Sequence, residues 1–302
     1  MNLSELSEKG KTWDKHKANA DKVSKYYASG GKSHLHNYAQ RINNCANWLK
    51  FRLVPDDNGS ISLELSDARF CRVRYCSVCQ WRRSLMWKAK AYKIMPKVVA
   101  EYPKYRWIFI TLTIKNCKIE ELRTTLNWLN RSFKRLTELK VWVAKGWIKS
   151  VEVTKGRERL SAHPHLHVLA MVPPSYFSHH YISHSRWIEL WQKCLRVDYQ
   201  PVVHVRAIAK DKNPNVIVPE ILKYQVKESD LVVDRTWFLE LTRQLHNTRA
   251  IALGGVLRGY MRELNLEAWE KLDSNYQKSD RTEEENLYCV WKHQGDKYKI
   301  KG

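Results

Sequence analysis

The stretch Ser161–Ala170 reads SAHPHLHVLA and decides how the surrounding chain folds. Its three histidines, His163, His165 and His167, alternate with proline and with apolar residues such as Leu166. Successive side chains of a strand point to opposite faces, so the imidazoles share one face, about 7 Å apart. Two such rings can tilt onto one ion, and neutral imidazole commonly binds divalent metals. A surface strand without a ligand is the ordinary alternative, but three histidines in strict alternation favour a metal site.

The composition points to a polyanionic partner. The chain has 302 residues and a net charge of +22, from 53 lysines and arginines against 31 acidic residues. A field of that sign attracts nucleic acid, with an anionic membrane surface as the competing partner. The sequence has no apolar run long enough to cross a bilayer, and its start, MNLSELSEKGK, does not resemble a signal peptide. We therefore expect a soluble, cytoplasmic protein with one large domain or two ordinary ones.

Four of the seven cysteines form a second cluster, with the spacing C-x25-C-x4-C-x2-C. An odd number of cysteines without an export signal argues against a disulfide framework. Cys76 and Cys79 bring two sulfurs to one ion, Cys71 is near in sequence, and a hairpin of strands at 48–53 and 61–65 can return Cys45. Four thiolates make a closed, structural zinc site. A redox CxxC is the alternative, but a thioredoxin-like context is missing.

Basic residues surround these cysteines in FCRVRYCSVCQWRR. They are expected to neutralise DNA phosphates, although they would equally solvate a small zinc-binding module. The candidate DNA-binding residues are Arg72, Arg74, Arg82 and Arg83.

The periodicity of the remaining chain predicts an α+β fold. A central antiparallel sheet with helices on one face leaves the other face open for a site. The expected elements are helices at 84–101, 119–139 and 187–195, strands at 107–114, 147–153 and 201–208, and a mostly helical segment at 236–264, interrupted near Gly254.

The strand at 147–153 precedes the histidine strand by roughly ten residues, which favours an antiparallel hairpin. Val151 and Val153 would then share the apolar face with Leu166. Glu152 would share the open face with the histidines, where its carboxylate is a candidate third ligand. An exposed strand glutamate is the routine alternative.

Farther along, PEILKYQVKESD begins at Pro219 and favours a helix. Glu220, Tyr224 and Lys227 would then lie on one face, one turn apart. A tyrosine between an acid and a lysine suits chemistry, but a solvated charged face is as good an explanation of the residues alone.

Taken in order, four motifs resemble the rolling-circle plasmid replication initiators, which are HUH endonucleases with two histidines around a hydrophobic residue. The motifs are FCRVRYCSVCQWRR, FITLT, HPHLHVL and KYQVKESD, and the resemblance runs from about Cys45 to about Arg262. It implies an HUH core of a central antiparallel sheet flanked by helices, with an N-terminal zinc-binding module. The expected regions are a helical and four-cysteine zinc-binding region at 1–102, the core at 103–232, C-terminal helices at 233–266 and a polar, flexible tail at 267–302.

By resemblance, His165 and His167 hold a divalent metal, Mn or Mg. Glu152 lies where a third ligand is expected, and His163 is an auxiliary candidate. The cysteine cluster would hold a structural zinc.

By resemblance also, Tyr224 is the nucleophile of the single-tyrosine type. Glu220 occupies the position of a glutamate that activates water for the final release of the protein from DNA. Lys227 occupies the position of the motif lysine. Attack on a phosphodiester would give a 5′-phosphotyrosine and a 3′-hydroxyl primer.

The implied partner is plasmid origin DNA, cleaved as a single strand, with host helicase and polymerase as further candidates and no membrane. Two alternatives stay open. A transposase or conjugative relaxase would use the same chemistry, whereas a non-catalytic, zinc-containing DNA-binding regulator would leave the histidine strand without a role.

Overall fold

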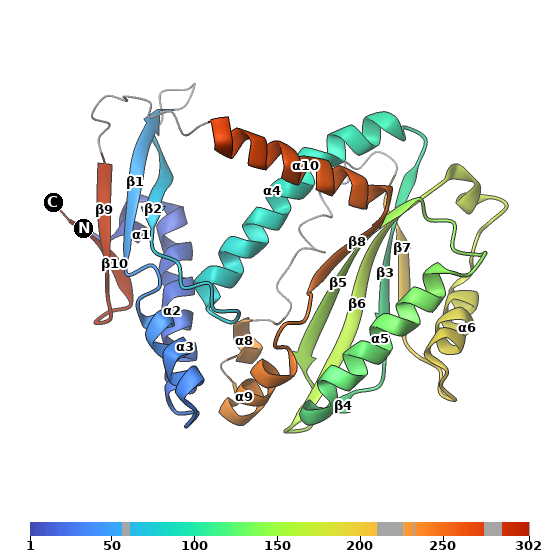
Figure 1. Cartoon of the computed structure of the whole chain (residues 1–302), viewed down its shortest axis with the longest axis horizontal. Helices are drawn as coiled ribbons and strands as arrows, with labels where there is room; N and C mark the ends of the chain where they lie inside the picture. The colour runs from blue at the N-terminus through green and yellow to red at the C-terminus, as the bar shows by residue number, and fades with distance from the viewer. Residues whose placement is uncertain (56–60, 210–225, 227, 232, 275–285, 302) are drawn as a thin grey trace. The chain divides into compact units, whose positions relative to one another are not determined.

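The computed structural model describes residues 1–301 apart from 56–60, 210–225, 227, 232 and 275–285 (Figure 1). The chain divides into two compact units. The cysteine unit comprises Met1–Arg83, Leu231–Leu239 and Tyr276–Gly302, and the histidine unit comprises Ser84–Asp230 and Glu240–Asn275. Within the described residues, no helix is both long and apolar enough to span a membrane.

The cysteine unit combines three N-terminal helices with a four-stranded antiparallel sheet in the order β10-β9-β1-β2. The predicted hairpin is present, and both of its strands are longer than the periodicity indicated. Aromatic rings fill the core, where Trp13 contacts Phe51 and Tyr298 edge to face. The elements are α1 (Leu3–Leu6), α2 (Glu8–Ala28), α3 (Ser33–Asn43), β1 (Trp48–Pro55), β2 (Ile61–Ala68), β9 (Asn286–Lys292) and β10 (Lys297–Lys301).

The end of the chain corrects a sequence prediction. Residues 286–301 were expected to belong to a flexible tail, but they form β9 and β10, and β9 pairs with β1. Cys289 and Trp291 on β9 are buried, as is Tyr298 on β10. These strands are short and rich in lysine, and their stabilising partner is at the other end of the sequence. Because that pairing is non-local, the local pattern does not reveal it.

The histidine unit is built on a six-stranded antiparallel sheet in the order β7-β3-β6-β5-β8, with β4 also pairing with β6. The α+β class and the antiparallel sheet are therefore as predicted. Three helices, α4, α8 and α9, contribute residues to both units. The elements are α4 (Ser77–Glu101), β3 (Arg106–Thr113), β4 (Cys117–Lys118), η1 (Ile119–Glu121), α5 (Leu122–Thr137), β5 (Gly146–Lys155), β6 (Ser161–Val172), η2 (Pro174–Phe177), α6 (His184–Leu195), β7 (Val203–Ala207), α8 (Glu228–Leu231), α9 (Arg235–Gln244), β8 (Ile251–Gly255) and α10 (Val256–Ser274).

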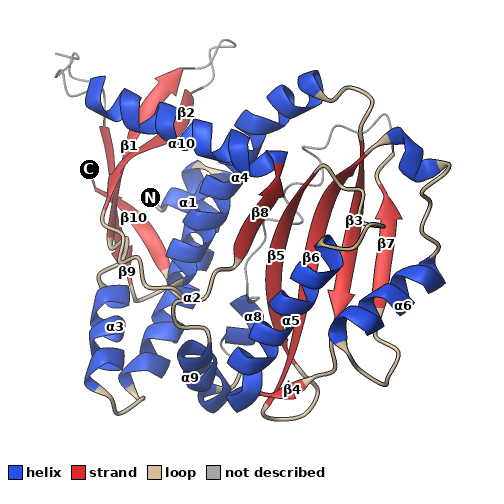
Figure 2. Ribbon diagram, turned by 45° about the vertical axis from the view of Figure 1, so that its right-hand side comes forward, coloured by secondary structure: helices blue, strands red, loops and turns tan. Residues whose placement is uncertain are grey.

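Helices α5 and α6 lie on one face of this sheet (Figure 2). The sequence of α5 places apolar residues three or four positions apart, which gives the helix one buried stripe. The buried residues of this stripe are Leu122, Leu126, Leu129, Phe133 and Leu136.

The opposite face of the sheet is divided between a packed half and a half that carries polar side chains. In the packed half, Phe109, Ile148 and Leu169 form a core with residues of α4 and α10 such as Ile94 and Leu257. The strand alternation continues from Leu169 back along β6 into the histidines. The face that is buried at one end therefore carries the polar site at the other.

Strand β8 was not predicted; the sequence suggested only an interruption of a helix near Gly254. A side chain at Gly254 would collide with the ring of Trp147, because an added Cβ lies 2.1 Å from it. Gly255 has a φ of +58°, a left-handed conformation that favours glycine. The two glycines therefore allow β8 to pair closely with β5 and then turn into α10.

Candidate functional site

Glu152, His165 and His167 converge on the polar half of the sheet. In the antiparallel pair of β5 and β6, Glu152 is directly opposite His165, so the carboxylate and the imidazoles share one face. One carboxylate oxygen, Oε2, lies 2.8 Å from His167 Nε2 and 3.2 Å from His165 Nε2. The predicted placement of Glu152 beside the histidines is therefore correct.

The other ring nitrogens of the two histidines have oxygen partners. His167 Nδ1 lies 3.1 Å from the hydroxyl of Thr111 on β3, and His165 Nδ1 lies 3.4 Å from the carbonyl oxygen of His163. With a cation on the site, each Nδ1–H can donate to its oxygen and leave the Nε2 lone pair to bind the ion, whereas without one an Nε2–H donates to Glu152. Thr111 is a site residue that the sequence interpretation missed, although its place in FITLT puts it on the histidine face.

This donor set fits a hard or borderline divalent metal. Two ligands at right angles, each about 2.1 Å from an ion, lie about 3.0 Å apart. The two nitrogen–oxygen distances bracket that separation. Two imidazoles and a carboxylate suit ions such as Mn²⁺.

The ionisation of Glu152 favours this role. Burial raises the pKa of the Glu152 carboxyl, but the hydrogen bonds to His165 and His167 outweigh burial, and the pKa is held well below its usual range. The side chain of Glu152 is 16% exposed. An anion in a largely shielded position attracts a cation strongly.

His163 lies beside the three residues without joining them. Its ring centroid is 5.2 Å from that of His165, and its Nδ1 lies 2.6 Å from Oδ1 of Asn116. Burial lowers the pKa of His163, with His165 adding to the effect. The structure therefore places His163 next to the candidate metal ligands, held by Asn116.

The segment predicted to carry the nucleophile is mostly outside the described residues. Tyr224, Glu220 and Lys227 all belong to this undescribed part. Beyond it, the carboxylate of Asp230 on α8 accepts a hydrogen bond of 3.1 Å from the backbone N–H of Lys155, at the end of β5. The end of this segment is thus attached to the strand that carries Glu152.

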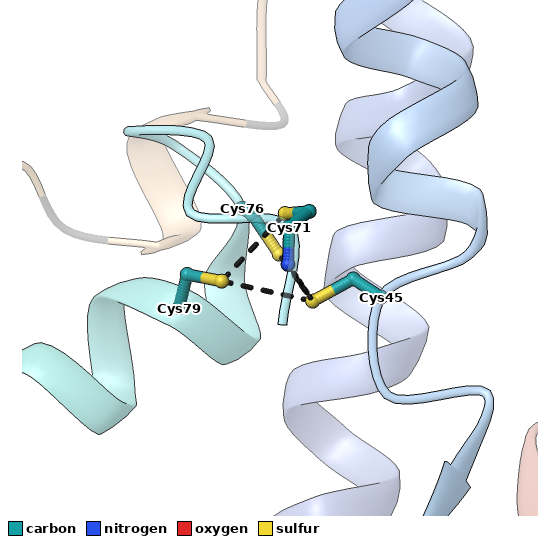
Figure 3. Close-up of side chains that lie close together, drawn as sticks. All are labelled: Cys45, Cys71, Cys76 and Cys79. Carbon is teal, nitrogen blue, oxygen red and sulfur yellow. Dashed lines mark hydrogen bonds between the residues drawn. The ribbon is translucent and has the colours of Figure 1, made fainter. Parts of the chain in front are cut away.

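The second candidate metal centre is the cysteine cluster, in the other unit (Figure 3). Each of the four sulfurs lies close to at least one other. The Sγ–Sγ distances are 3.6 Å for the pairs Cys45–Cys79, Cys71–Cys79 and Cys45–Cys76. Tetrahedral zinc with bonds of about 2.3 Å would hold its sulfurs about 3.8 Å apart. The cluster therefore has the dimensions of a four-thiolate zinc site, and Cys45 is its fourth member, as predicted.

Backbone amides surround the sulfurs. Arg72 N–H points to Cys79 Sγ at 3.3 Å, and Cys71 N–H points to Cys45 Sγ at 3.4 Å. Hydrogen bonds from the other cysteines hold the pKa of Cys79 far below its usual value, whereas hydrogen bonding and burial raise the pKa of Cys76. A bound cation would favour the thiolate form of all four sulfurs.

The four candidate DNA-binding arginines have different surroundings. Arg82 lies over the rings of Phe70 and Trp13, at 5.5 and 6.0 Å, and burial lowers its pKa. The guanidinium of Arg74 lies 5.9 Å from the ring of Tyr75. Arg82 and Arg74 thus pack on aromatic rings of the cysteine unit. The other two, Arg72 and Arg83, are exposed.

A family model described as replication protein matches residues 62–299, which is most of the chain. The matched range includes His165 and His167 and three of the four clustered cysteines. The chain belongs to the replication protein family. This assignment confirms the kinship with plasmid replication initiators that the four motifs indicated.

Individual relatives in the family align over most of their length. "Protein rep" of Lactiplantibacillus plantarum is 34% identical over 283 residues, covering 87% of this chain and 88% of that protein. "Protein rep" of Streptococcus pneumoniae serotype 2 (strain D39 / NCTC 7466) is 33% identical over 273 residues, covering 87% and 84%. "Replication protein" of Staphylococcus aureus is 31% identical over 226 residues, covering 69% and 96%. No solved structure matches the chain significantly.

Proposed function

We propose that this protein starts rolling-circle replication of a plasmid by nicking one strand of the origin. The observation that carries the proposal is the convergence of Glu152, His165 and His167 on the polar half of the sheet, in a chain of the replication protein family. This family assignment favours replication over transposition or conjugative transfer. The fold would be an HUH endonuclease core with a zinc-binding module.

Tyr224 is the proposed nucleophile. Its phenolate oxygen attacks the phosphorus of the scissile phosphodiester, and the bond from phosphorus to the 3′ oxygen breaks. The products are a 5′-phosphotyrosine and a free 3′-hydroxyl that primes a polymerase. One ester replaces another, so the step needs no nucleotide hydrolysis.

A phenol, with a reference pKa of about 10, is a weak nucleophile at neutral pH. A divalent cation on Glu152, His165 and His167 would act as a Lewis acid at the phosphate oxygens. Lys227 would stabilise the phenolate or the phosphate by charge. Glu220 would act as a general base for water in the final release step, so that the second cleavage is hydrolytic.

The described end of the segment that carries Tyr224 supports a position of the tyrosine near the candidate metal site. Asp230 is bonded to the backbone of Lys155, which is three residues from Glu152 along β5. Tyr224 precedes the start of α8 at Glu228 by four residues, and four residues span at most about 14 Å, so the tyrosine is tethered close to the end of β5.

The cysteine cluster would have a structural role. Its four ligands leave no open position for a substrate, as expected of a closed zinc site. The zinc-binding module would stabilise the cysteine unit and help to bind DNA, with Arg72 and Arg83 as exposed cations.

The decisive test is a nicking assay with Tyr224→Phe on labelled single-stranded candidate origin oligonucleotides, in the presence of Mn²⁺ or Mg²⁺. We expect the variant to lose cleavage and the covalent protein–DNA adduct while it still binds DNA. Tyr181→Phe is the matched control, because Tyr181 is 66% exposed in the histidine unit. Cleavage by the Tyr224 variant, or a wild-type protein that never cleaves, would refute the proposal.

A further inference from the structure

A polar cavity of about 480 Å³ opens beside the cysteine cluster, within the cysteine unit. Helix α3 forms one side of it, and the chain that leaves β2 toward the cysteines forms the other. Among the residues that the structure describes, none of those lining the cavity is acidic. The polar side chains that line it are three amides and three guanidinium groups: Asn37, Gln40, Asn44, Arg41, Arg69 and Arg72.

The sequence of α3 divides this helix into two faces. Leu35, Ala39 and Ile42 recur four and then three residues apart and are buried. The residues on the cavity side are exposed, including Asn37 and Gln40. An 11-residue helix is about 16 Å long, and the major groove of DNA, about 12 Å wide, admits such a helix.

The chemistry of this surface matches that of base edges. Asparagine and glutamine make paired hydrogen bonds with adenine, arginine makes them with guanine, and arginines also neutralise phosphates. We propose that the exposed face of α3, together with the cavity, binds double-stranded origin DNA and recognises its sequence. This inference rests on the proposed function, to which it adds a recognition site separate from the histidine site.

The surroundings of Phe70 favour duplex over single-stranded DNA. Single strands bind by stacking unpaired bases on aromatic rings. Of the described residues that line the cavity, Phe70 is the aromatic one, but the guanidinium of Arg82 lies over its ring and Trp13 is stacked with it at 6.5 Å. A ring that is already covered in this way offers little surface to a base, whereas the amides of α3 are exposed.

The cysteine cluster holds this surface in shape. Arg41 Nη2 donates a hydrogen bond of 2.6 Å to the carbonyl oxygen of Cys71 and so joins α3 to the cysteine segment. Arg72 has a left-handed φ of +59°, and its backbone N–H points to the sulfur of Cys79. A zinc ion on the four sulfurs would therefore fix the positions of both arginines.

The inference is tested by selecting binding sites from a pool of randomised duplexes with full-length protein. We expect the wild-type protein to enrich a sequence motif, and Asn37→Ala with Gln40→Ala to reduce its preference for that motif over a shuffled duplex by about tenfold or more. Alanine is the best helix former, so the double variant should keep α3 folded. Asn127→Ala, at an exposed position of α5, is the matched control and should retain the preference.

A second pair of variants separates phosphate contacts from base recognition. Arg69→Ala and Arg72→Ala should weaken binding to motif and shuffled duplexes alike, and each should lower the salt dependence by about one counterion. Nicking of single-stranded oligonucleotides should be unchanged in the amide double variant and in the Asn127 variant. An unchanged motif preference in the amide double variant would overturn the inference, even if the wild-type protein nicks DNA. A wild-type protein that does not nick DNA would instead overturn the proposed function.

Discussion

Replacing Thr111 with valine tests the candidate metal site without removing any of its ligands. The Thr111 hydroxyl lies 3.1 Å from His167 Nδ1 and is the group that orients this imidazole toward Glu152. Valine has a similar shape and suits a strand, so β3 should form as before. His167 would remain on β6, but its ring would lose the hydrogen-bond partner that fixes its orientation and tautomer.

The expected magnitude follows from the role of such partners. Loss of a hydrogen bond to a metal-binding histidine typically weakens metal affinity by about 10- to 100-fold, or about 1.4–2.8 kcal/mol. The free energy of unfolding of the metal-free protein should fall by less, about 0.5–1.5 kcal/mol, because one hydrogen bond is lost.

The measurement is a Mn²⁺ titration by calorimetry, with nicking rates followed over the same concentrations. Thr113→Val is the matched control: it is two residues along the same strand, and its hydroxyl donates to the carbonyl of Val202 rather than to a histidine. Saturating metal should restore nicking by the Thr111 variant. If both variants bind Mn²⁺ as tightly as the wild-type protein, Thr111 does not orient a metal ligand.

Three further outcomes are expected. Glu220→Ala should spare the first nick and slow hydrolytic release in a time course; equal loss of both steps would exclude its role as a base. Cys76→Ser should lose bound zinc and lower the melting temperature, whereas Cys289→Ala, at a buried cysteine outside the cluster, should keep its zinc as judged by metal analysis. Burial lowers the pKa of Lys149 from 10.5 to about 8, so the unfolded chain binds more protons between these values. The free energy of unfolding contributed by this group should therefore rise by up to about 3 kcal/mol from pH 8 to 10.5, and Lys149→Met should abolish this rise in denaturant titrations.

The histidine site was predictable because its information is local. A strand imposes a period of two, so the alternation in Ser161–Ala170 assigns each side chain to a face before any partner is known. The short connection to the preceding strand then makes an antiparallel hairpin the expected pairing, which brings Glu152 opposite the histidines. The cysteine cluster was predictable for a similar reason, because Cys76 and Cys79 are close in sequence.

Features that depend on distant partners were not predicted. Strand β9 pairs with β1 across almost the whole chain, and β8 is stabilised by β5 and by the close approach of Gly254 to Trp147. Neither strand has a local pattern strong enough to distinguish it from a polar tail or a broken helix. Thr111 belongs to the same class, because only the pairing of β3 with β6 places its hydroxyl beside His167.

By itself, the sequence determined the residue types of both candidate metal sites and the face on which the three histidines lie, because strand periodicity and cysteine spacing are local properties. Only the tertiary structure decided which donors meet. It directs both His165 and His167 at one oxygen of Glu152 and leaves His163 with Asn116. The physical reason is that strand register and ring orientation are set by hydrogen bonds from other strands, and these come from parts of the chain far from the histidines themselves.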